Sequence, residues 1–269
     1  MNKLDRKRDQ FVVVCAESLE AAQQLIPTAR HAAEQMHKGL MLLTCAEGGG
    51  QWAPQTGIPY VALRGDWQAA IAGLPTVFNA ILAVTLADHK APKGSFANPR
   101  QMLDNFAQCK VAYIVVNADP EGRQPVRNDW RRVAMTLDHR RESKEKVIWA
   151  SYLARFFGSR ITVWHRQYSD GGFQSRLENN IRYMDKIFGS FGLEYERSPY
   201  SEGSQYGNPD LAAAPQCLTD LYVAQVPERR LPGIPLRIGV PNEQKLLRLL
   251  AGTPVLFLNE RDDLYILCD

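Results

Sequence analysis

The residue types that most often carry chemistry are scattered along this sequence. The five histidines have neither the His-Glu-x-x-His nor the His-x-His spacing of a metal site, so we expect no bound metal: His31, His37, His89, His139 and His165. Ser18 and Ser95 lie outside any Gly-x-Ser-x-Gly elbow, and neither has a base nearby in the sequence. These observations argue against hydrolase chemistry, and we expect no catalytic residues.

The glycine cluster Gly48-Gly49-Gly50 does not form a known phosphate-binding motif. It is followed by Gln51 and Trp52, whereas a P-loop continues with Gly-Lys and then Ser or Thr. The spacing also differs from the Gly-x-Gly-x-x-Gly fingerprint of dinucleotide-binding folds. We interpret the cluster as a flexible connection.

Apolar runs of strand length alternate with helical patterns in the first half. Residues 11–15 form a continuous apolar run, which is typical of a strand buried on both faces of a parallel sheet. Residues 22–36 show the spacing of one helical face, and Pro27 within them predicts a kink or a later helix start. The remaining strands are expected at 40–45, 60–63, 80–86 and 111–116, with helices near 67–71 and 99–107. Short crossovers of this kind require a parallel sheet.

The same order of elements restarts in the second half. Strands are expected at 133–137, 161–164, 193–196, 218–226 and 255–258, with helices at 143–157, 177–188 and 242–251. Both halves end alike, because a helix with Asn98 or Asn242 at its expected N-cap leads into a strand that closes with Asn117 or Asn259. A repeat of about 140 residues indicates duplication. We predict domains at 1–125 and 126–269; the alternative is one larger doubly wound sheet.

The composition is that of a globular protein, with 45% apolar and 23% charged residues. The net charge of +3 is small and the basic residues form no long stripe, so no nucleic-acid partner is expected. The first eight residues are too polar for a signal peptide, and no apolar stretch reaches the roughly 18 residues of a membrane helix. We therefore expect a cytoplasmic protein without membrane insertion. The five cysteines lack Cys-x-x-Cys pairing and are expected to be buried free thiols.

This order of strands and helices, with the closing segment Gly252-Thr253-Pro254-Val255-Leu256, resembles the universal stress protein family. The resemblance covers nearly the whole chain and rests on pattern more than on an invariant motif. It implies an α/β fold of two tandem doubly wound domains, each a five-stranded parallel sheet of order 3-2-1-4-5 flanked by helices. It also implies that the two domains associate through their last strands as a pseudo-dimer within one chain, with a further homodimer as an open expectation.

Some members of that family bind ATP or AMP at the carboxyl ends of the strands, where doubly wound sheets generally bind ligands. Binding members carry an Asp at the end of the first strand, and the resemblance places Asp138 there in the second half. Ala16 stands at the corresponding position in the first half. The alternative for Asp138 is that it faces solvent or caps the following helix.

The phosphate signature of the family is altered in both halves. In the family, the signature is Gly, two residues, a second Gly, nine residues, and then Gly followed by Ser or Thr. The first half of this sequence keeps only Gly94-Ser95. In the second half, residues 227–240 contain two glycines at another spacing and three prolines. We therefore do not expect ATP to bind in the familiar mode. A modified site would use Asp138, Gly239, Asn242, Arg229, Arg230 and Arg237, because arginines can replace backbone amides as anion partners. The alternative is a loop of solvated arginines.

The leading hypothesis is a non-catalytic stress-response protein that senses an adenine nucleotide, another small anion or a small molecule through its second half. ATP and AMP are the candidate ligands, and no cofactor is certain. One alternative is a degenerate scaffold that acts through protein contacts, for example on a transporter. Another is a slow ATPase, against which the altered phosphate signature argues.

Overall fold

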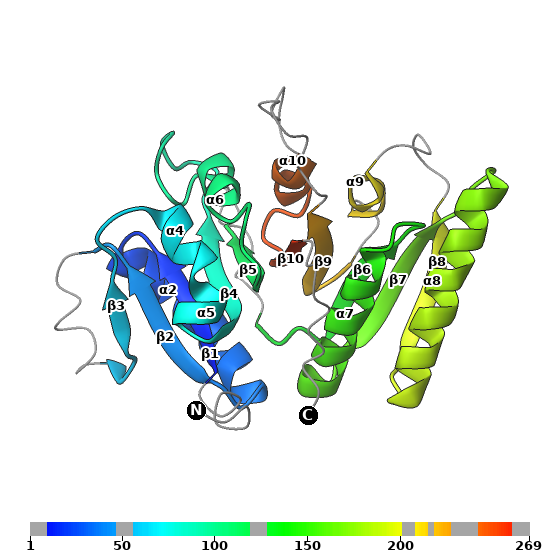
Figure 1. The fold of residues 1–269 in the computed structure, drawn as a ribbon, viewed down its shortest axis with the longest axis horizontal. Helices are drawn as coiled ribbons and strands as arrows, with labels where there is room; N and C mark the ends of the chain where they lie inside the picture. The colour runs from blue at the N-terminus through cyan, green and yellow to red at the C-terminus, as the bar shows by residue number, and fades with distance from the viewer. Residues whose placement is uncertain are drawn as a thin grey trace. The chain divides into compact units, whose positions relative to one another are not determined.

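The computed structural model describes residues 10–46, 56–118, 128–200, 208–214, 218–226 and 242–259. The chain divides into two compact units, residues 1–128 and 129–269. Each unit is a parallel sheet with helices packed on it (Figure 1), so the α/β fold predicted from the sequence is confirmed.

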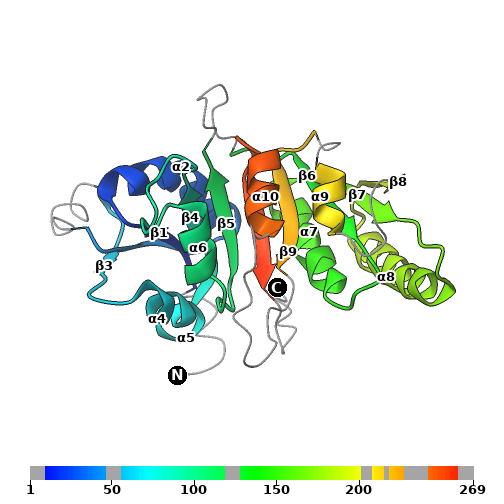
Figure 2. The ribbon, with the colours of Figure 1, turned by 90° about the horizontal axis from the view of Figure 1, so that it is seen from above.

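The strands of the first unit lie in the order β3-β2-β1-β4-β5, which is the predicted order 3-2-1-4-5. All of its described strand pairs are parallel. Helix α2 lies on one side of these strands, and α4 and α5 lie on the other (Figure 2). The elements are β1 (Phe11–Ala16), α2 (Leu19–Gln35), β2 (Gly39–Thr44), β3 (Tyr60–Ala62), α4 (Trp67–Ala72), α5 (Leu74–Val77), β4 (Ala80–Ala87), α6 (Pro99–Asn105) and β5 (Ala112–Asn117).

The second unit repeats this order as β8-β7-β6-β9-β10, again with parallel pairing between its described strands. Helices α7 and α8 pack against each other, and so do α9 and α10. The elements are β6 (Arg132–Leu137), α7 (Ser143–Phe157), β7 (Arg160–Arg166), α8 (Gly171–Ser190), β8 (Tyr195–Tyr200), α9 (Pro209–Ala213), β9 (Leu221–Val226), α10 (Asn242–Leu249) and β10 (Val255–Asn259).

The apolar runs form the core of each unit. Every residue of β4, β5 and β10 is buried, because helices cover both faces of a parallel sheet and leave no solvated side. Helix α2 begins at Leu19, so the expected later start near Pro27 is wrong. Its N-cap Ser18 accepts a hydrogen bond from the backbone N–H of Ala21 at 3.1 Å, which satisfies one free amide of the first turn.

Several boundaries differ from the sequence-based prediction. Helices α5 and α9 were not predicted from the sequence. Strand β8 runs to Tyr200, four residues beyond the predicted end. Strand β9 begins at Leu221 instead of Leu218, and Leu218 is 86% exposed. Asn98 caps α6 as predicted, whereas Asn242 is the first helical residue of α10 and is exposed. Of the described cysteines, Cys15 and Cys109 are buried but Cys45 is exposed, which corrects the expectation of buried thiols throughout. The glycine cluster 48–50 lies outside the described residues.

No helix in the described ranges is both long and apolar enough to cross a bilayer.

Candidate functional site

The strand order of the second unit changes direction between β6 and β9. Strand β6 pairs with β7 on one side and with β9 on the other. In open α/β sheets the crevice outside the carboxyl ends of such strands is the usual ligand site. Asp138 directly follows β6, so its side chain stands at this switch point.

The Asp138 carboxylate is buried and already hydrogen-bonded. Asp138 is 2% exposed, and its Oδ1 accepts from the backbone N–H of Arg140 at 3.0 Å and from the Ser143 hydroxyl. Its Oδ2 accepts from Nε of Arg140 at 2.6 Å. The alternative that Asp138 faces solvent is therefore wrong. The alternative that Asp138 caps α7 is also wrong. The N-cap residue of α7 is Glu142, whose side chain makes no capping hydrogen bond, and the Asp138 carboxylate bonds the side chain of Ser143.

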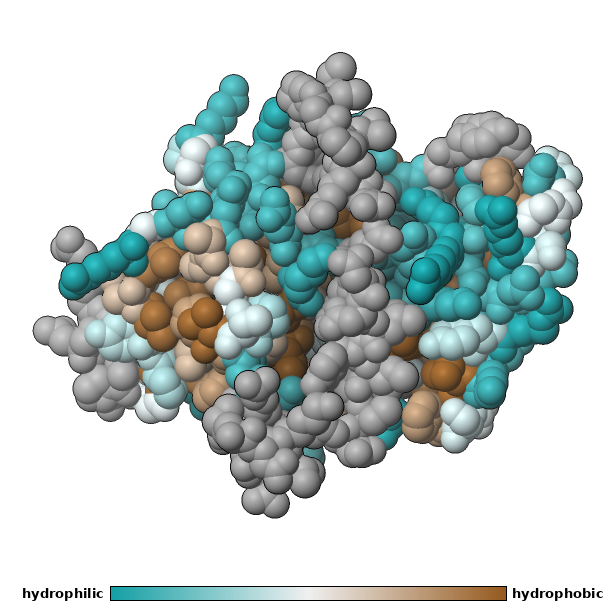
Figure 3. Space-filling view, in the orientation of Figure 1, coloured by the Kyte–Doolittle hydropathy of each residue, from teal (hydrophilic) through white to brown (hydrophobic). Residues whose placement is uncertain are grey.

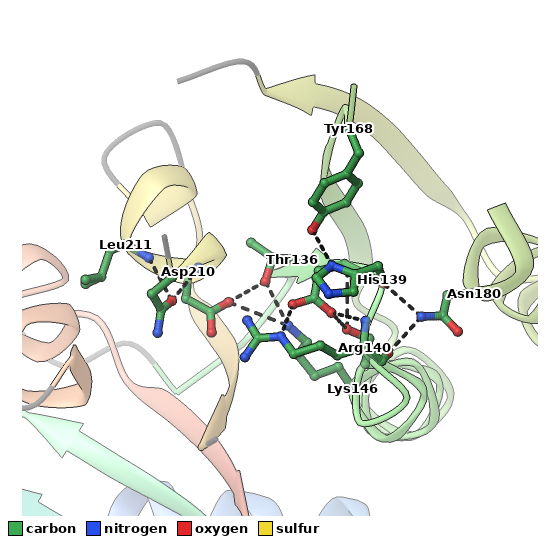
Figure 4. Close-up of polar contacts among 11 residues, drawn as sticks. Thr136, His139, Arg140, Lys146, Tyr168, Asn180, Asp210 and Leu211 are labelled. Carbon is green, nitrogen blue, oxygen red and sulfur yellow. Dashed lines mark hydrogen bonds and ion pairs between the residues drawn. The ribbon is translucent and has the colours of Figure 1, made fainter. Parts of the chain in front are cut away.

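A second polar network lies beside the first and is formed by side chains that the sequence-based reasoning did not select (Figure 4). Lys146, only 1% exposed, donates from Nζ to Oγ1 of Thr136 at 2.8 Å and lies 3.6 Å from Oδ1 of Asp210. The Thr136 hydroxyl donates to the Asp210 carboxylate, and the Tyr222 hydroxyl donates to the same oxygen at 3.3 Å. A buried ion pair with these added hydrogen bonds holds α7, β6 and α9 together.

Helix α8 fixes the loop that carries Asp138. The Asn180 side chain donates from Nδ2 to the backbone oxygens of Asp138 and Arg140, both at 2.8 Å. The His139 ring stacks on Phe173 with centroids 4.3 Å apart, and its Nδ1 lies 2.9 Å from the Tyr168 hydroxyl. These contacts, several of them visible in Figure 4, hold the loop in one conformation.

The charges in this site favour an ionised Asp138. Burial alone would raise its pKa, but the charges of Lys146 and Arg140 and the hydrogen bonds from Ser143 and the Arg140 backbone outweigh burial and lower the pKa. For His139, burial is the main cause of a lowered pKa, and nearby Arg140 and Arg176 act in the same direction. The imidazole is therefore neutral at pH 7.

A cavity of about 230 Å³ opens beside these networks. Its most telling residue is Gln225, from β9, whose Nε2 and Oε1 are both buried and have no hydrogen-bond partner in the part of the chain that the structure describes. A carboxamide offers an acceptor and two donors, and leaving a buried polar group unpaired costs about 1–3 kcal/mol. The cavity is lined by Asp138, Arg140, Glu142, Ser143, Lys146, Asn208, Pro209, Asp210 and Gln225.

The structure describes only one of the other residues predicted for this site. Gly239, Arg229, Arg230 and Arg237 lie outside the described residues. Asn242 is described, but it does not line the cavity. Within the described ranges no group of three His, Cys, Asp or Glu side chains could hold a metal ion.

At the corresponding position of the first unit, a carboxylate of the unit itself binds the loop that precedes α6. Ala16 ends β1, and the next residue, Glu17, accepts with Oε2 from the Ser95 hydroxyl at 2.8 Å and from the Phe96 backbone N–H at 2.9 Å. Gly94 precedes these donors with φ of 92°, a conformation that favours glycine. The loop with Gly94 and Ser95, which corresponds to part of the phosphate signature, therefore binds the carboxylate of Glu17.

Two tandem units with strand order 3-2-1-4-5 define a known class of α/β protein, and solved structures of that class resemble the chain. A universal stress protein from Archaeoglobus fulgidus is 12% identical, with a TM-score of 0.61 over 95% of this chain and 98% of that one. The cytoplasmic domain of a prokaryotic cation chloride cotransporter is 10% identical, with a TM-score of 0.60 over 93% and 95%. A functionally unknown protein from Pseudomonas aeruginosa is 13% identical, with a TM-score of 0.58 over 95% and 93%.

These identities are low, so the likeness establishes the fold. The chain has the universal stress protein fold along nearly its whole length, and the resemblance predicted from the sequence is confirmed at that level. No protein-family model matches the sequence, and no curated protein matches it.

Proposed function

We propose that the chain is a non-catalytic, cytoplasmic stress-response protein of the universal stress type whose second unit senses a small molecule. The proposal rests above all on Gln225, a buried carboxamide without a partner among the described residues, in a cavity at the β6–β9 switch point. An unpaired buried amide destabilises the folded protein, and a ligand that supplies the missing hydrogen bonds removes this cost. The complementary ligand carries a donor and an acceptor side by side.

An adenine nucleotide, AMP or ATP, is the ligand that we propose. A Gln carboxamide can pair with the N6 and N7 atoms of adenine. Asp138 already uses three of the roughly four acceptor positions of a carboxylate, so the base would bind mainly through Gln225. The described cavity of about 230 Å³ is smaller than the roughly 300–1,000 Å³ of most ligand pockets, which fits the base alone. Arg229, Arg230, Arg237 and Gly239 remain our proposed partners for the phosphates.

The decisive experiment replaces Gln225 by methionine, which keeps the length of the side chain and removes its polar atoms. The ligand-free Gln225→Met variant should melt at the wild-type temperature or above it, because an unpaired buried amide is gone. The thermal shift that adenine, AMP or ATP causes in the wild type should disappear in this variant. Gln244→Met, on α10, is the matched control and should keep the shift.

Native mass spectrometry of the purified protein complements the melting curves by showing whether a nucleotide is retained. A wild-type protein that neither retains nor responds to any of the three ligands would reject the sensing proposal. A shift that survives in Gln225→Met would place the ligand elsewhere.

A scaffold that acts through protein contacts is the second candidate. Figure 3 shows an apolar area over α4 and α5, where Val77 is 72% exposed. Exposed apolar areas of this kind often mark contact surfaces. If the chain forms a homodimer through this area, sedimentation velocity should find a dimer for the wild type and a monomer for Val77→Asp; equal sedimentation of the two would reject this contact.

A further inference from the structure

A second, larger cleft of about 500 Å³ lies between the segment that leads into α7 and the middle of α8. Most of its charged side chains are cations, and Glu142 is the one carboxylate among the described residues that line it. Figure 3 shows hydrophilic surface over these two helices. The cleft is lined by His139, Arg140, Arg141, Glu142, Lys144, Arg176, Asn179 and Asn180.

Three of the four cations lack a carboxylate partner. Arg140 is paired with Asp138, but within the described ranges Arg141, Lys144 and Arg176 form no ion pair. Elsewhere in the same unit, Arg132 is paired with Asp220 at 2.9 Å and Arg160 with Glu196 at 3.5 Å. The cleft therefore brings three cations without a carboxylate partner among the described residues to one opening.

One neutral side chain of the cleft, Asn179, can offer a hydrogen-bond donor to a ligand. Asn179 accepts from Nη2 of Arg182 at 2.5 Å with its Oδ1, so its Nδ2 is the atom left to face a ligand. The first turn of α7, a helix of 15 residues, adds the partial positive charge of a helix N-terminus. Cations from α7 and α8 and this dipole face one opening.

We propose that this cleft binds an oligophosphate, meaning a compact anion with at least two linked phosphoryl groups. Arginine guanidiniums can bind phosphoryl oxygens in a bidentate way. Arg141 lies just before α7 and Arg176 lies on α8, so guanidiniums from two segments of the chain are available for the two charged groups of a linear anion. The cleft shares Arg140 and Glu142 with the Gln225 cavity, but the other residues that line it are different, and the proposal does not depend on the function proposed for that cavity. Free oligophosphate and the phosphate chain of a nucleotide share this chemistry, so both are included in the test.

The experiment is calorimetric titration of the full chain with pyrophosphate, tripolyphosphate, ATP and sulfate at low and moderate salt. Wild type should bind tripolyphosphate at least as tightly as ATP, and both more tightly than sulfate. Arg141→Ala and Arg176→Ala should each weaken tripolyphosphate binding about fivefold, and raising the salt from about 50 to about 200 mM should weaken it further. Glu142→Gln should tighten binding by a similar factor, because it removes a carboxylate from the cleft.

The controls separate this site from general charge and from the nucleotide proposal. Arg131→Ala removes an exposed arginine of the same unit that is paired with Asp129, and it should leave the affinity unchanged. Gln225→Met should also leave tripolyphosphate binding unchanged, even where it abolishes the response to adenine. Arg141 and Arg176 are exposed, so their variants should fold, which melting curves verify.

Three results would each overturn the oligophosphate site. The first is a loss of affinity in Arg131→Ala equal to that in Arg176→Ala, and the second is sulfate binding as tight as that of tripolyphosphate. The third is binding of ATP without binding of tripolyphosphate.

Discussion

At the scale of single residues, Asp138 shows how burial and charge combine. Its lowered pKa means that the unfolded chain takes up the proton more readily than the folded one. The stabilisation is therefore complete above the unfolded pKa of about 3.9 and is lost as the pH falls through the lower folded value. Acid should weaken the second unit through this carboxylate.

Asp138→Asn tests that dependence. Breaking a buried ion pair costs about 3–5 kcal/mol, but the Arg140 side chain is 40% exposed and can turn to water, so we expect a loss of about 2 kcal/mol at pH 7. Below pH 3.9 the difference from wild type should shrink, as measured by urea unfolding at both pH values. Asp129→Asn, at an exposed site, should behave as wild type at both. An undiminished gap in acid would contradict the assignment.

Glu17 is the residue-scale counterpart in the first unit. Its contacts with the Ser95 hydroxyl and the Phe96 amide are charge-assisted hydrogen bonds near the surface, so Glu17→Ala should destabilise the protein by about 1 kcal/mol. A double-mutant cycle with Ser95→Ala, measured by urea unfolding, should give a coupling of at least about 0.5 kcal/mol. Strictly additive losses would show that Glu17 does not act as the internal anion of this loop.

At the scale of elements, helix α7 carries the link between β6 and α9. Lys146→Met leaves the Asp210 carboxylate buried without its cation, so urea unfolding should show a loss of about 3 kcal/mol. Replacing both residues, as Lys146→Met with Asp210→Leu, removes the unpaired charge. The double variant should therefore be more stable than the sum of the two single losses predicts, and additivity would mean that the pair is not coupled.

How far the sequence predicts an element depends on its length. Helix α7 was predicted at Ser143–Phe157 because its apolar face repeats over several turns. The structure ends the helix there with Gly158 as its C-cap, at φ of 65°. Helices α5 and α9 have four and five residues, too few for a period to show. Asp210 lies on α9 and was not among the site residues predicted from the sequence.

The site was only partly predictable for a related reason. Asp138 could be placed by its position after a strand, whereas Lys146, Asp210 and Gln225 come together from α7, α9 and β9 through tertiary packing. Two signals were present in the sequence. Lys146 interrupts the buried face of α7, and Gln225 interrupts the apolar run of β9. A polar residue at a core position needs a partner or a ligand.

At the scale of the whole molecule, two units of one fold differ in their chemistry. The first unit binds its own Glu17 at the switch point, and the second keeps a cavity there. The two units therefore share the position of the switch point but have different side chains there. This is expected when function is set by side chains and not by the fold. Ligand binding should consequently be a property of the second unit alone.

That division leads to a prediction about independent folding. Each unit has its own sheet of complete order 3-2-1-4-5 and its own buried strands, and their lengths are typical of domains that fold alone. Residues 1–128 and 129–269, produced separately, should each unfold cooperatively in urea when followed by circular dichroism. If the sensing proposal holds, only the fragment 129–269 should gain thermal stability from AMP or ATP. A fragment without a cooperative transition would mean that its sheet needs the other unit to fold. A nucleotide response in residues 1–128 would contradict the prediction that ligand binding is confined to the second unit.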